Sequence, residues 1–348
     1  MTSMQVMILP LVFFYLTSYI FLLFSNPRKV NDTISTIVCS HESDLDGIFS
    51  ASIASIKFPE ADISFYNYGR SNFEKMFEHI MLNVKKEEST GKIIISDLGI
   101  NPDVEDLTIS AIREFNRMGW KVILVDHHPW SKQAKSSIAP LATVIHDESG
   151  KRCASELMFE YIRLESKVAK QLSIMAHAMD FMTGAVYIVP ISELIQYYRN
   201  LSHSEKSLTD LARKAANGVL WDTEMQSSYG RFLSIYEKEK QSAWKSLVMR
   251  KIAGLDVAFL CISNYIQSSL FSKEVFSRTG ADLCLLYGTN GRVSIRRNNN
   301  KASCRIIASF LVEGGGHDYA AGGKLKSIAL DTDACVRELE EVVRIALK

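Results

Sequence analysis

Short apolar runs alternate with longer amphipathic segments between about residues 35 and 130. Thr36–Ser40, Lys92–Ser96 and Lys121–Val125 each contain three or four consecutive apolar residues, which is typical of strands buried on both faces of a sheet. Strands of this kind alternating with helices predict an α/β fold with a parallel sheet covered on both faces. The same region is expected to contain the strand Ile63–Tyr68 and the helices Gly47–Lys57, Asn72–Lys86 and Asp103–Met118.

The pattern changes twice in the second half of the chain. It is mostly helical and charged from about residue 154 to residue 251, and short strands then return. We therefore predict a parallel-sheet domain at residues 35–190, a helical connector at 191–254 and a smaller α/β domain at 255–348. The helices expected here are Ser155–Leu164, Lys167–Asp180, Ser207–Lys251 and Lys301–Phe310, and the strands are Val257–Ile262, Leu283–Gly288 and Arg292–Arg297.

Residues 1–30 are expected to form a separate leader. Met7–Phe24 is an uncharged, apolar run of 18 residues, close to the roughly 20 needed to span a bilayer, so it predicts an N-terminal transmembrane helix. Arg28 and Lys29 follow the run, which puts the catalytic part in the cytoplasm. Two other interpretations stay open. One is a cleaved signal peptide, although no basic start or A-x-A-like exit is present, and the other is a leader added by an upstream start codon.

The overall charge limits the class of partner. The 348 residues include 40 basic and 39 acidic side chains, for a net charge of +1, so no global basic field exists to attract long duplex nucleic acid. The six cysteines lie far apart without a C-x-x-C pair. This spacing argues against a structural zinc site or a disulfide framework.

Acidic and histidine side chains gather at four places, three of which directly follow a predicted strand. Carboxylates and imidazoles are costly to bury together unless a metal ion neutralises them. The carboxyl ends of parallel strands also meet at one edge of the sheet, where ligands bind. The four clusters therefore predict one polynuclear metal site, typical of a hydrolase. They are Ser40–Gly47, Ser96–Leu98, Val125–Pro129 and His177–Asp180.

Residue type and spacing indicate how these side chains would share two ions. Asp44 and Asp46 lie two apart in a loop, so each can address a different ion, and Asp97 can bridge the pair. His127 and Asp180 complete the ligands, and imidazole shifts the preference from Mg²⁺ toward Mn²⁺. Two ions about 3.5–4 Å apart activate a water and stabilise both oxygens of a phosphoryl displacement. The histidine after His127 can donate to a phosphate oxygen.

A second motif, rich in glycine, lies near the C-terminus. Gly314, Gly315 and Gly316 precede His317. Glycine backbone lets N–H groups approach an anion, and the histidine can donate to a phosphate or a terminal hydroxyl. Simpler interpretations exist for single motifs, because glycines also form flexible turns and an aspartate after a strand, such as Asp97, is often a helix cap.

Taken together, the motifs resemble those of the DHH phosphoesterase superfamily over about residues 35–345. The glycine motif is similar to that of the DHH-associated C-terminal domain of RecJ-type exonucleases, oligoribonucleases and cyclic-dinucleotide phosphodiesterases. Five motifs occur in the family's order: D-L-D-G at Asp44–Gly47, Asp97, D-H-H at Asp126–His128, Asp180, and G-G-G-H at Gly314–His317.

The resemblance assigns a role to each matching residue. It implies that His128 contacts the scissile phosphate and that Asp126 supports the histidines. Arg296 resembles an arginine that contacts nucleotide, beside the substrate-binding residues Gly314, Gly315, Gly316 and His317. The metal ligands implied are Asp44, Asp46, Asp97, His127 and Asp180, with Asp97 bridging, and His41 as a further ligand whose spacing differs between branches of the family.

The resulting expectation is an enzyme, a Mn²⁺-dependent phosphodiesterase with two ions, or Mg²⁺ in their place. It would hydrolyse short oligonucleotides or dinucleotides to 5′-mononucleotides. Its partner would be a short single strand, and a homodimer is left open. The alternatives are a cyclic-dinucleotide phosphodiesterase, a RecJ-like single-strand exonuclease, and a non-catalytic scaffold that binds nucleic acid.

Overall fold

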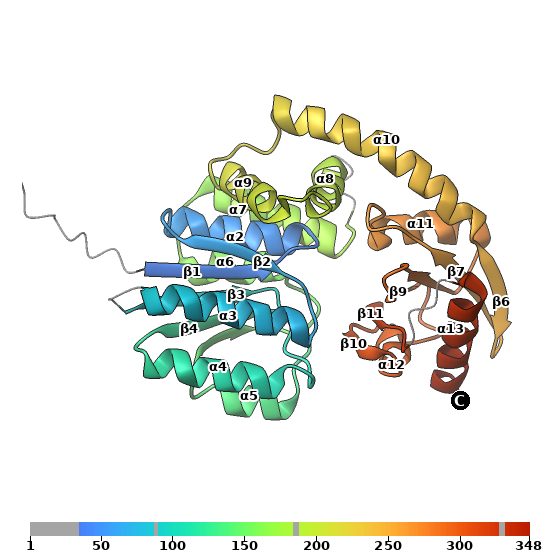
Figure 1. Cartoon of the computed structure of the whole chain (residues 1–348), viewed down its shortest axis with the longest axis horizontal. Coiled ribbons are helices and arrows are strands. Elements are labelled where there is room, and N and C mark those ends of the chain that lie inside the picture. The colour runs from blue at the N-terminus through green and yellow to red at the C-terminus, as the bar shows by residue number, and fades with distance from the viewer. Residues whose placement is uncertain (1–34, 87–89, 184–187, 327–330) are drawn as a thin grey trace, which may run out of the picture. The chain divides into compact units, whose positions relative to one another are not determined.

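The computed structural model describes residues 35–86, 90–183, 188–326 and 331–348 of the chain. They belong to one structural unit, Ser35–Lys348. Within these residues, the strands form one sheet of five and one of six (Figure 1).

The first sheet is parallel throughout, as the apolar runs predict. Its strands are β1 (Ser35–His41), β2 (Asp62–Tyr66), β3 (Gly91–Ser96), β4 (Lys121–Asp126) and β5 (Thr143–His146), in the order β2-β1-β3-β4-β5. Ser40 pairs with Ser96, and Ser96 pairs with Val125. Strands β1, β3 and β4 therefore end at the same edge, and the residues that follow them are brought together.

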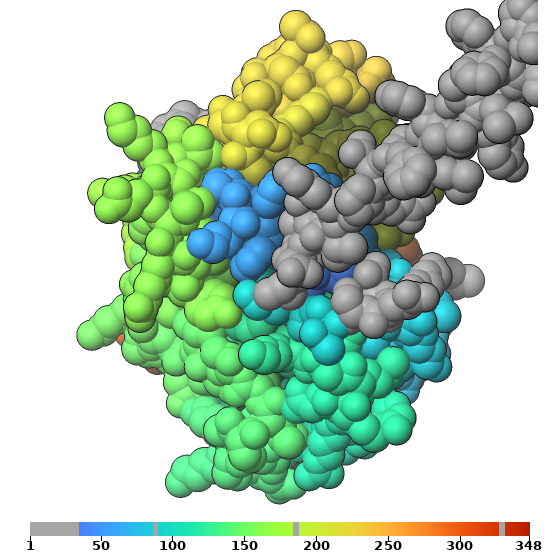
Figure 2. All heavy atoms as spheres, turned by 90° about the vertical axis from the view of Figure 1, so that its left-hand side faces the viewer, coloured from blue at the N-terminus to red at the C-terminus, as the bar shows by residue number. Residues whose placement is uncertain are grey.

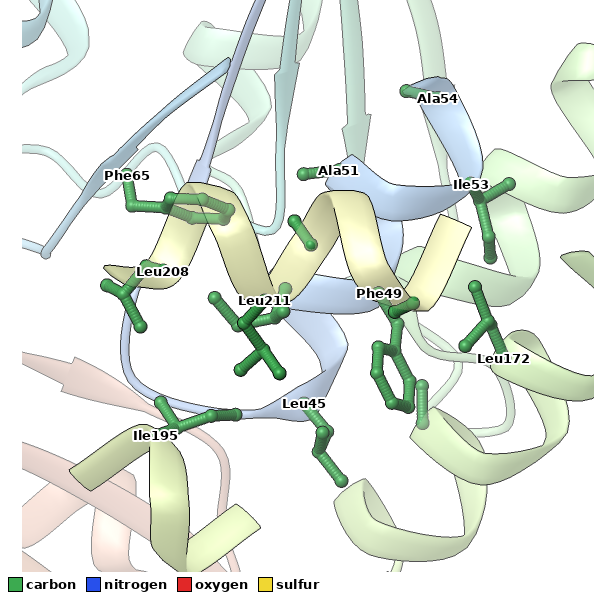
Figure 3. Packing of buried hydrophobic residues seen from close by; sticks show 14 of the residues in the cluster. Leu45, Phe49, Ala51, Ile53, Ala54, Phe65, Leu172, Ile195, Leu208 and Leu211 are labelled. Atoms are coloured by element: carbon green, nitrogen blue, oxygen red, sulfur yellow. The ribbon is translucent and has the colours of Figure 1, made fainter. Parts of the chain in front are cut away.

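One face of this sheet is covered by five helices, with α2 at their centre. Every residue from Leu45 to Ser55 is buried, because α2 packs against β1 on one side and other helices on the rest. Figure 3 shows Leu45 and Phe49 of α2 in one apolar cluster with Leu172 and Leu211. The helices of this face are α2 (Leu45–Lys57), α6 (Ala154–Ile162), α7 (Lys167–Asp180), α8 (Val189–Arg199) and α9 (Ser204–Ala216).

The opposite face of the sheet carries a second core. Phe73, Ile112 and Ile138 belong to one buried cluster with the strand residues Ile93 and Val122. Helices on both faces confirm the predicted α/β arrangement. These helices are α3 (Arg70–Lys86), α4 (Glu105–Arg117) and α5 (Lys132–Ile138).

The single long helix predicted over Ser207–Lys251 is wrong. Helix α9 ends before Gly218, whose φ of 79° is left-handed, a conformation that favours glycine and stops a helix. A new helix then starts after Asp222, whose side chain accepts from the Met225 N–H at 2.8 Å. The last residues of the predicted helix instead form a strand. The elements observed are α10 (Thr223–Lys245) and β6 (Val248–Ile252).

The C-terminal sheet is mixed. It has the order β10-β11-β9-β8-β7-β6, in which only the β7–β8 pair is parallel. Leu339 and Val343 of the last helix pack with Phe259 and Leu285 in its core. The remaining elements are β7 (Leu255–Cys261), α11 (Ser268–Thr279), β8 (Leu283–Tyr287), β9 (Arg292–Arg297), α12 (Cys304–Ala308), β10 (Val312–Gly316), β11 (Ala320–Lys324) and α13 (Thr332–Ala346).

The predicted fold class included an N-terminal transmembrane helix, and that element is corrected. None of the helices in the described ranges is long and apolar enough to cross a membrane. The longest, α10, has 23 residues but carries charged side chains along its length, which a bilayer core disfavours. Met7–Phe24, on which the prediction relied, lies outside the described residues.

The two ends of the parallel sheet differ in what surrounds them. Figure 2 looks at the amino ends of its strands, where green segments around residues 140–180 and teal segments around residues 90–130 make up much of the surface. The acidic and histidine clusters lie at the other end, where residues of the C-terminal sheet line a cleft with them.

Candidate metal centre

All four predicted clusters converge at the carboxyl end of the parallel sheet. His41 is the last residue of β1, Asp97 directly follows β3, and Asp126 is the last residue of β4. Asp44 is the N-cap of α2 and accepts from the Gly47 N–H at 3.2 Å. The fourth cluster arrives from a helix rather than a strand, because Asp180 is the last residue of α7.

One group of donors, the His41 set, consists of His41, Asp44 and Asp97. The His41 Nδ1 atom lies 3.2 Å from Asp44 Oδ2 and 3.5 Å from Asp97 Oδ2. One donor atom from each residue falls within 4.8 Å of the others. This spacing is compatible with three ligands around one ion.

The second group, the His127 set, is built on Asp46, Asp97 and His127, whose donor atoms lie within 4.8 Å of one another, and includes Asp180 beside His127. The His127 Nε2 atom lies 3.4 Å from Asp97 Oδ1 and 3.6 Å from Asp46 Oδ2. On the other side of the ring, His127 Nδ1 lies 3.9 Å from Asp180 Oδ2. Histidine and three carboxylates are hard or borderline donors of the kind that Mn²⁺ accepts.

Asp97 belongs to both sets, and its two oxygens face different ways. Oδ2 lies toward His41 and Oδ1 toward His127. The backbone of Asp97 is left-handed, with φ of 56°, and its N–H donates to the Val125 carbonyl at 2.9 Å. Aspartate tolerates this conformation better than most residues. The turn directs the carboxylate into the space between the two sets.

Neighbouring groups fix the orientation of several of these side chains. Asp46 accepts from the Ala154 and Ser155 N–H groups at 2.8 and 2.7 Å, at the start of α6. Asp126 lies 2.8 Å from His128 Nδ1 and accepts from Trp130 Nε1 at 2.5 Å. Asp126 therefore orients His128 instead of joining the His41 or His127 set.

The shifted pKa values of the buried residues in this site indicate that a cation would stabilise it. Burial, opposed by His127, raises the pKa of Asp180 to about 6, and the charges of Asp44 and Asp97 add to the rise. Burial followed by the Asp97 charge raises the pKa of Asp46 well above its usual value. Although burial opposes it, Asp44 and Asp97 raise the pKa of His41 to about 10. Carboxylates that repel one another and draw protons onto their neighbours are the donors that a divalent ion stabilises.

Unsatisfied buried atoms provide a second indication that metal ions fit. Burial without a hydrogen-bond partner costs about 1–3 kcal/mol per polar group in proteins. Here the buried atoms without such a partner include members of both sets, which a coordinated ion would satisfy. They are Asp97 Oδ2 and Asp180 Oδ2.

The glycine-rich segment faces this centre across a cleft of about 1020 Å³. The His317 ring lies 5.3 Å from the His128 ring and 5.6 Å from the His127 ring, between centroids. Burial, and then the charges of His128 and His127, lower the pKa of His317 to about 3, so this imidazole is neutral at pH 7. Its buried Nε2 has no hydrogen-bond partner among the described residues.

Two glycines of this segment, Gly314 and Gly316, are required by the local backbone. A Cβ on Gly314 would collide with the Ala308 carbonyl, and Gly316 has φ of 127°. Arg296, on β9, also lines the cleft, where its Nη2 lies 3.4 Å from Ser268 Oγ and its Nε has no partner. The backbone here is thus shaped by packing, and it leaves Gly315 with open space around it.

Sequence reasoning missed several cleft residues. The Tyr68 hydroxyl lies 3.1 Å from His128 Nε2 and 3.4 Å from His41 Nδ1. Tyr68 follows β2, so the rule that ligands gather beyond parallel strands could have found it. Arg199 pairs with Glu42 at 2.8 Å, and no pattern in α8 indicated that contact.

Comparisons with known proteins agree with this architecture. Residues 35–186 match the model described as "DHH family, N-terminal domain". No curated protein sequence matches the chain. The DHH domain of a member of a family of ribosomal proteins is 16% identical over 90% of this chain and 87% of its own, with a TM-score of 0.60. At this level of identity, the likeness shows a shared fold and nothing more.

Two further solved structures are less similar. RecJ from Thermus thermophilus, in complex with Mg²⁺, is 13% identical, covering 89% of this chain and 50% of its own, with a TM-score of 0.44. An exopolyphosphatase-related protein from Bacteroides fragilis is 13% identical, covering 99% of both chains, with a TM-score of 0.49.

Proposed function

Residues 35–186 of this chain belong to the DHH family, and we propose that the chain is a Mn²⁺-dependent phosphodiesterase of short nucleic acids. It would hydrolyse dinucleotides and short oligonucleotides to 5′-mononucleotides. In this proposal residues 35–190 supply the metal ligands, residues 191–254 connect, and residues 255–348 supply most contacts to the substrate.

The observation that carries the proposal is the position of Asp97 between the two sets of donors. With its oxygens 3.5 Å from His41 Nδ1 and 3.4 Å from His127 Nε2, this one carboxylate is suited to bridge two ions. When bound, such a pair of ions supplies an activated water and stabilises the entering and leaving oxygens of a phosphoryl transfer. The remaining ligands would be His41 and Asp44 on one side, and Asp46, His127 and Asp180 on the other.

The chain's own residues would bind and orient the phosphodiester. His128, held by Asp126 at 2.8 Å, presents its other nitrogen toward Tyr68 and the cleft. His317 is neutral and has an unsatisfied buried nitrogen, so it can donate to a phosphate oxygen or a hydroxyl. Arg296 has unused donors in the same cleft. Together these groups would fix a phosphate between the metal centre and the glycine-rich segment.

The charge of the chain and the size of the cleft favour short substrates. Its volume of about 1020 Å³ lies at the upper end of pockets for small ligands, which span about 300–1,000 Å³. A net charge of +1 provides little attraction for a long polyanion. A dinucleotide or a short oligomer matches both features.

A substrate panel tests the proposal. Dinucleotides, a pentanucleotide, a long single strand and cyclic dinucleotides should each be incubated with Mn²⁺, with Mg²⁺ and with chelator. We expect the short linear substrates to be hydrolysed fastest with Mn²⁺, and chelator to abolish the reaction.

The control is Asp106→Asn, which changes an aspartate whose side chain is 71% exposed and pairs with Arg70 on the surface. This variant should keep wild-type rates. Preferential hydrolysis of cyclic dinucleotides or of the long strand would replace the proposal with that activity. Binding of all these ligands without hydrolysis under any metal condition would favour a non-catalytic scaffold.

A further inference from the structure

A two-residue hairpin tip presents an aromatic side chain at the mouth of the cleft. The His317 N–H donates to the Ala320 carbonyl at 2.7 Å, so Asp318 and Tyr319 form the tip between β10 and β11. Tyr319 lines the cleft and is 38% exposed. Among the described aromatic side chains that line the cleft, it is the one that ranks as exposed.

The other tip residue anchors the hairpin. Asp318 Oδ1 accepts from Ser303 Oγ at 2.6 Å and lies 3.3 Å from Arg305 Nε. Its carbonyl also accepts from the Cys304 N–H at 2.9 Å. The tip is therefore tied to the start of α12. A side chain held in place before binding loses less conformational entropy when a ligand arrives.

The Tyr319 ring extends a row of rings that begins at the metal centre. Its centroid is 5.0 Å from that of His317, and the two rings are parallel within 4°. The His317 ring in turn stacks at 28° on His128. Burial and the nearby Asp180 carboxylate, against the effect of Arg296, raise the pKa of Tyr319 to about 12. The phenol therefore stays neutral, and its ring remains a flat apolar surface beside a phosphate-binding row.

We propose that Tyr319 is a base-stacking residue, which selects substrates that carry a nucleobase over phosphates that lack one. This inference rests on the proposed function for the identity of the substrate. It explains how a centre built for phosphoryl transfer could distinguish nucleotides from inorganic polyphosphate. One face of the ring is occupied by His317, and the exposed remainder is available to a purine or pyrimidine.

A binding cycle that requires no hydrolysis tests the stacking. Adenosine 5′-monophosphate and ribose 5-phosphate share the sugar and the phosphate and differ by the base. With Mn²⁺ present, wild type should bind the nucleotide about 5- to 150-fold more tightly, as expected from roughly 1–3 kcal/mol per stacked base. Tyr319→Ala should lose that difference and leave the Kd of ribose 5-phosphate unchanged. Tyr319→Phe should keep it.

Phe310→Ala is the matched control, because Phe310 is 40% exposed in the same segment and does not line the cleft. It should alter neither Kd. Equal loss of affinity for both ligands in Tyr319→Ala would indicate that the ring only supports His317, and would overturn the proposal. So would a wild type that does not prefer the nucleotide.

A kinetic measurement separates this proposal from the proposed function. For a dinucleotide, Tyr319→Ala should raise KM by the same factor as the Kd, with a smaller change in kcat. Suppose that Tyr319→Ala loses the preference for the nucleotide but that wild type does not hydrolyse dinucleotides. The stacking is then supported, and the proposed reaction is rejected. If wild type hydrolyses dinucleotides but Tyr319→Ala keeps the preference for the nucleotide, the reaction is supported and the stacking is rejected.

Discussion

Replacing Asp97 with asparagine should uncouple the two sets of donors without disturbing the fold. The substitution keeps the size and shape of the side chain and removes its charge. Asparagine also tolerates the left-handed backbone at this position, where φ is 56°. Alanine would be a poorer choice, since a left-handed conformation costs most residues about 1–2 kcal/mol.

The expected magnitude follows from the shared position of Asp97. An amide has one oxygen to offer, so it cannot place one oxygen in the His41 set and another in the His127 set. The His41 set would keep two donors and the His127 set three, and bound Mn²⁺ should fall from about two ions per chain to about one. Loss of the second ion should lower kcat by about 10³-fold or more, which corresponds to about 4 kcal/mol of transition-state stabilisation.

The assay combines metal analysis, dinucleotide hydrolysis and thermal unfolding. Asp97 is 2% exposed and its carboxylate lies among like charges, so the metal-free variant should melt no lower than metal-free wild type. Asp106→Asn again serves as the control. A variant with two tightly bound ions, or with more than about a tenth of the wild-type rate, would remove Asp97 from the bridging position.

Three other substitutions give distinct expectations. Arg296→Ala and His317→Ala should each raise KM for a dinucleotide by about 10- to 150-fold, the equivalent of about 1.5–3 kcal/mol for a charged hydrogen bond. Metal content should stay normal, and a loss of Mn²⁺ in either variant would place that residue in the metal centre. Phe49→Ala should lower the free energy of unfolding by about 3–5 kcal/mol, because Phe49 is wholly buried in the α2 cluster. Denaturant unfolding measures this, and a loss under about 1 kcal/mol would contradict the central place given to α2.

The parallel sheet was predictable because its signal is local. Strands such as β3 and β4 are buried on both faces, so each has a continuous apolar run at its centre, Ile93–Ile95 and Val122–Val125, that stands out in the sequence. Elements with mixed surroundings were missed. Strand β5 has four residues, none of them fully buried. The hairpin of β6 and β7 turns at Ala253 and Gly254, both with positive φ. Of these two residues, only the glycine is a sequence signal for such a turn.

The candidate site could be anticipated from the topology of the parallel sheet. Residues after β1, β3 and β4 must meet, whatever the loops do, because the registers of the three strands align. The sequence does not indicate which polar groups of the site are hydrogen-bonded by other residues of the protein. Trp130 and Asp126 are four residues apart, and nothing in that spacing indicates that the indole would hold the carboxylate that orients His128.

Asp46 illustrates how far the protein prepares the centre before any ion arrives. Both of its oxygens already accept N–H groups from the start of α6, where the helix dipole favours negative charge. Asp97 and Asp180, by contrast, each keep a buried oxygen without a hydrogen-bond partner. A carboxylate oxygen has two lone pairs, so Asp46 can hold both its helix contacts and an ion. Its orientation is fixed by the fold, whereas the unsatisfied oxygens of Asp97 and Asp180 gain most when a cation binds. The affinity of the centre should therefore depend chiefly on Asp97 and Asp180, each of which keeps an oxygen without a hydrogen bond.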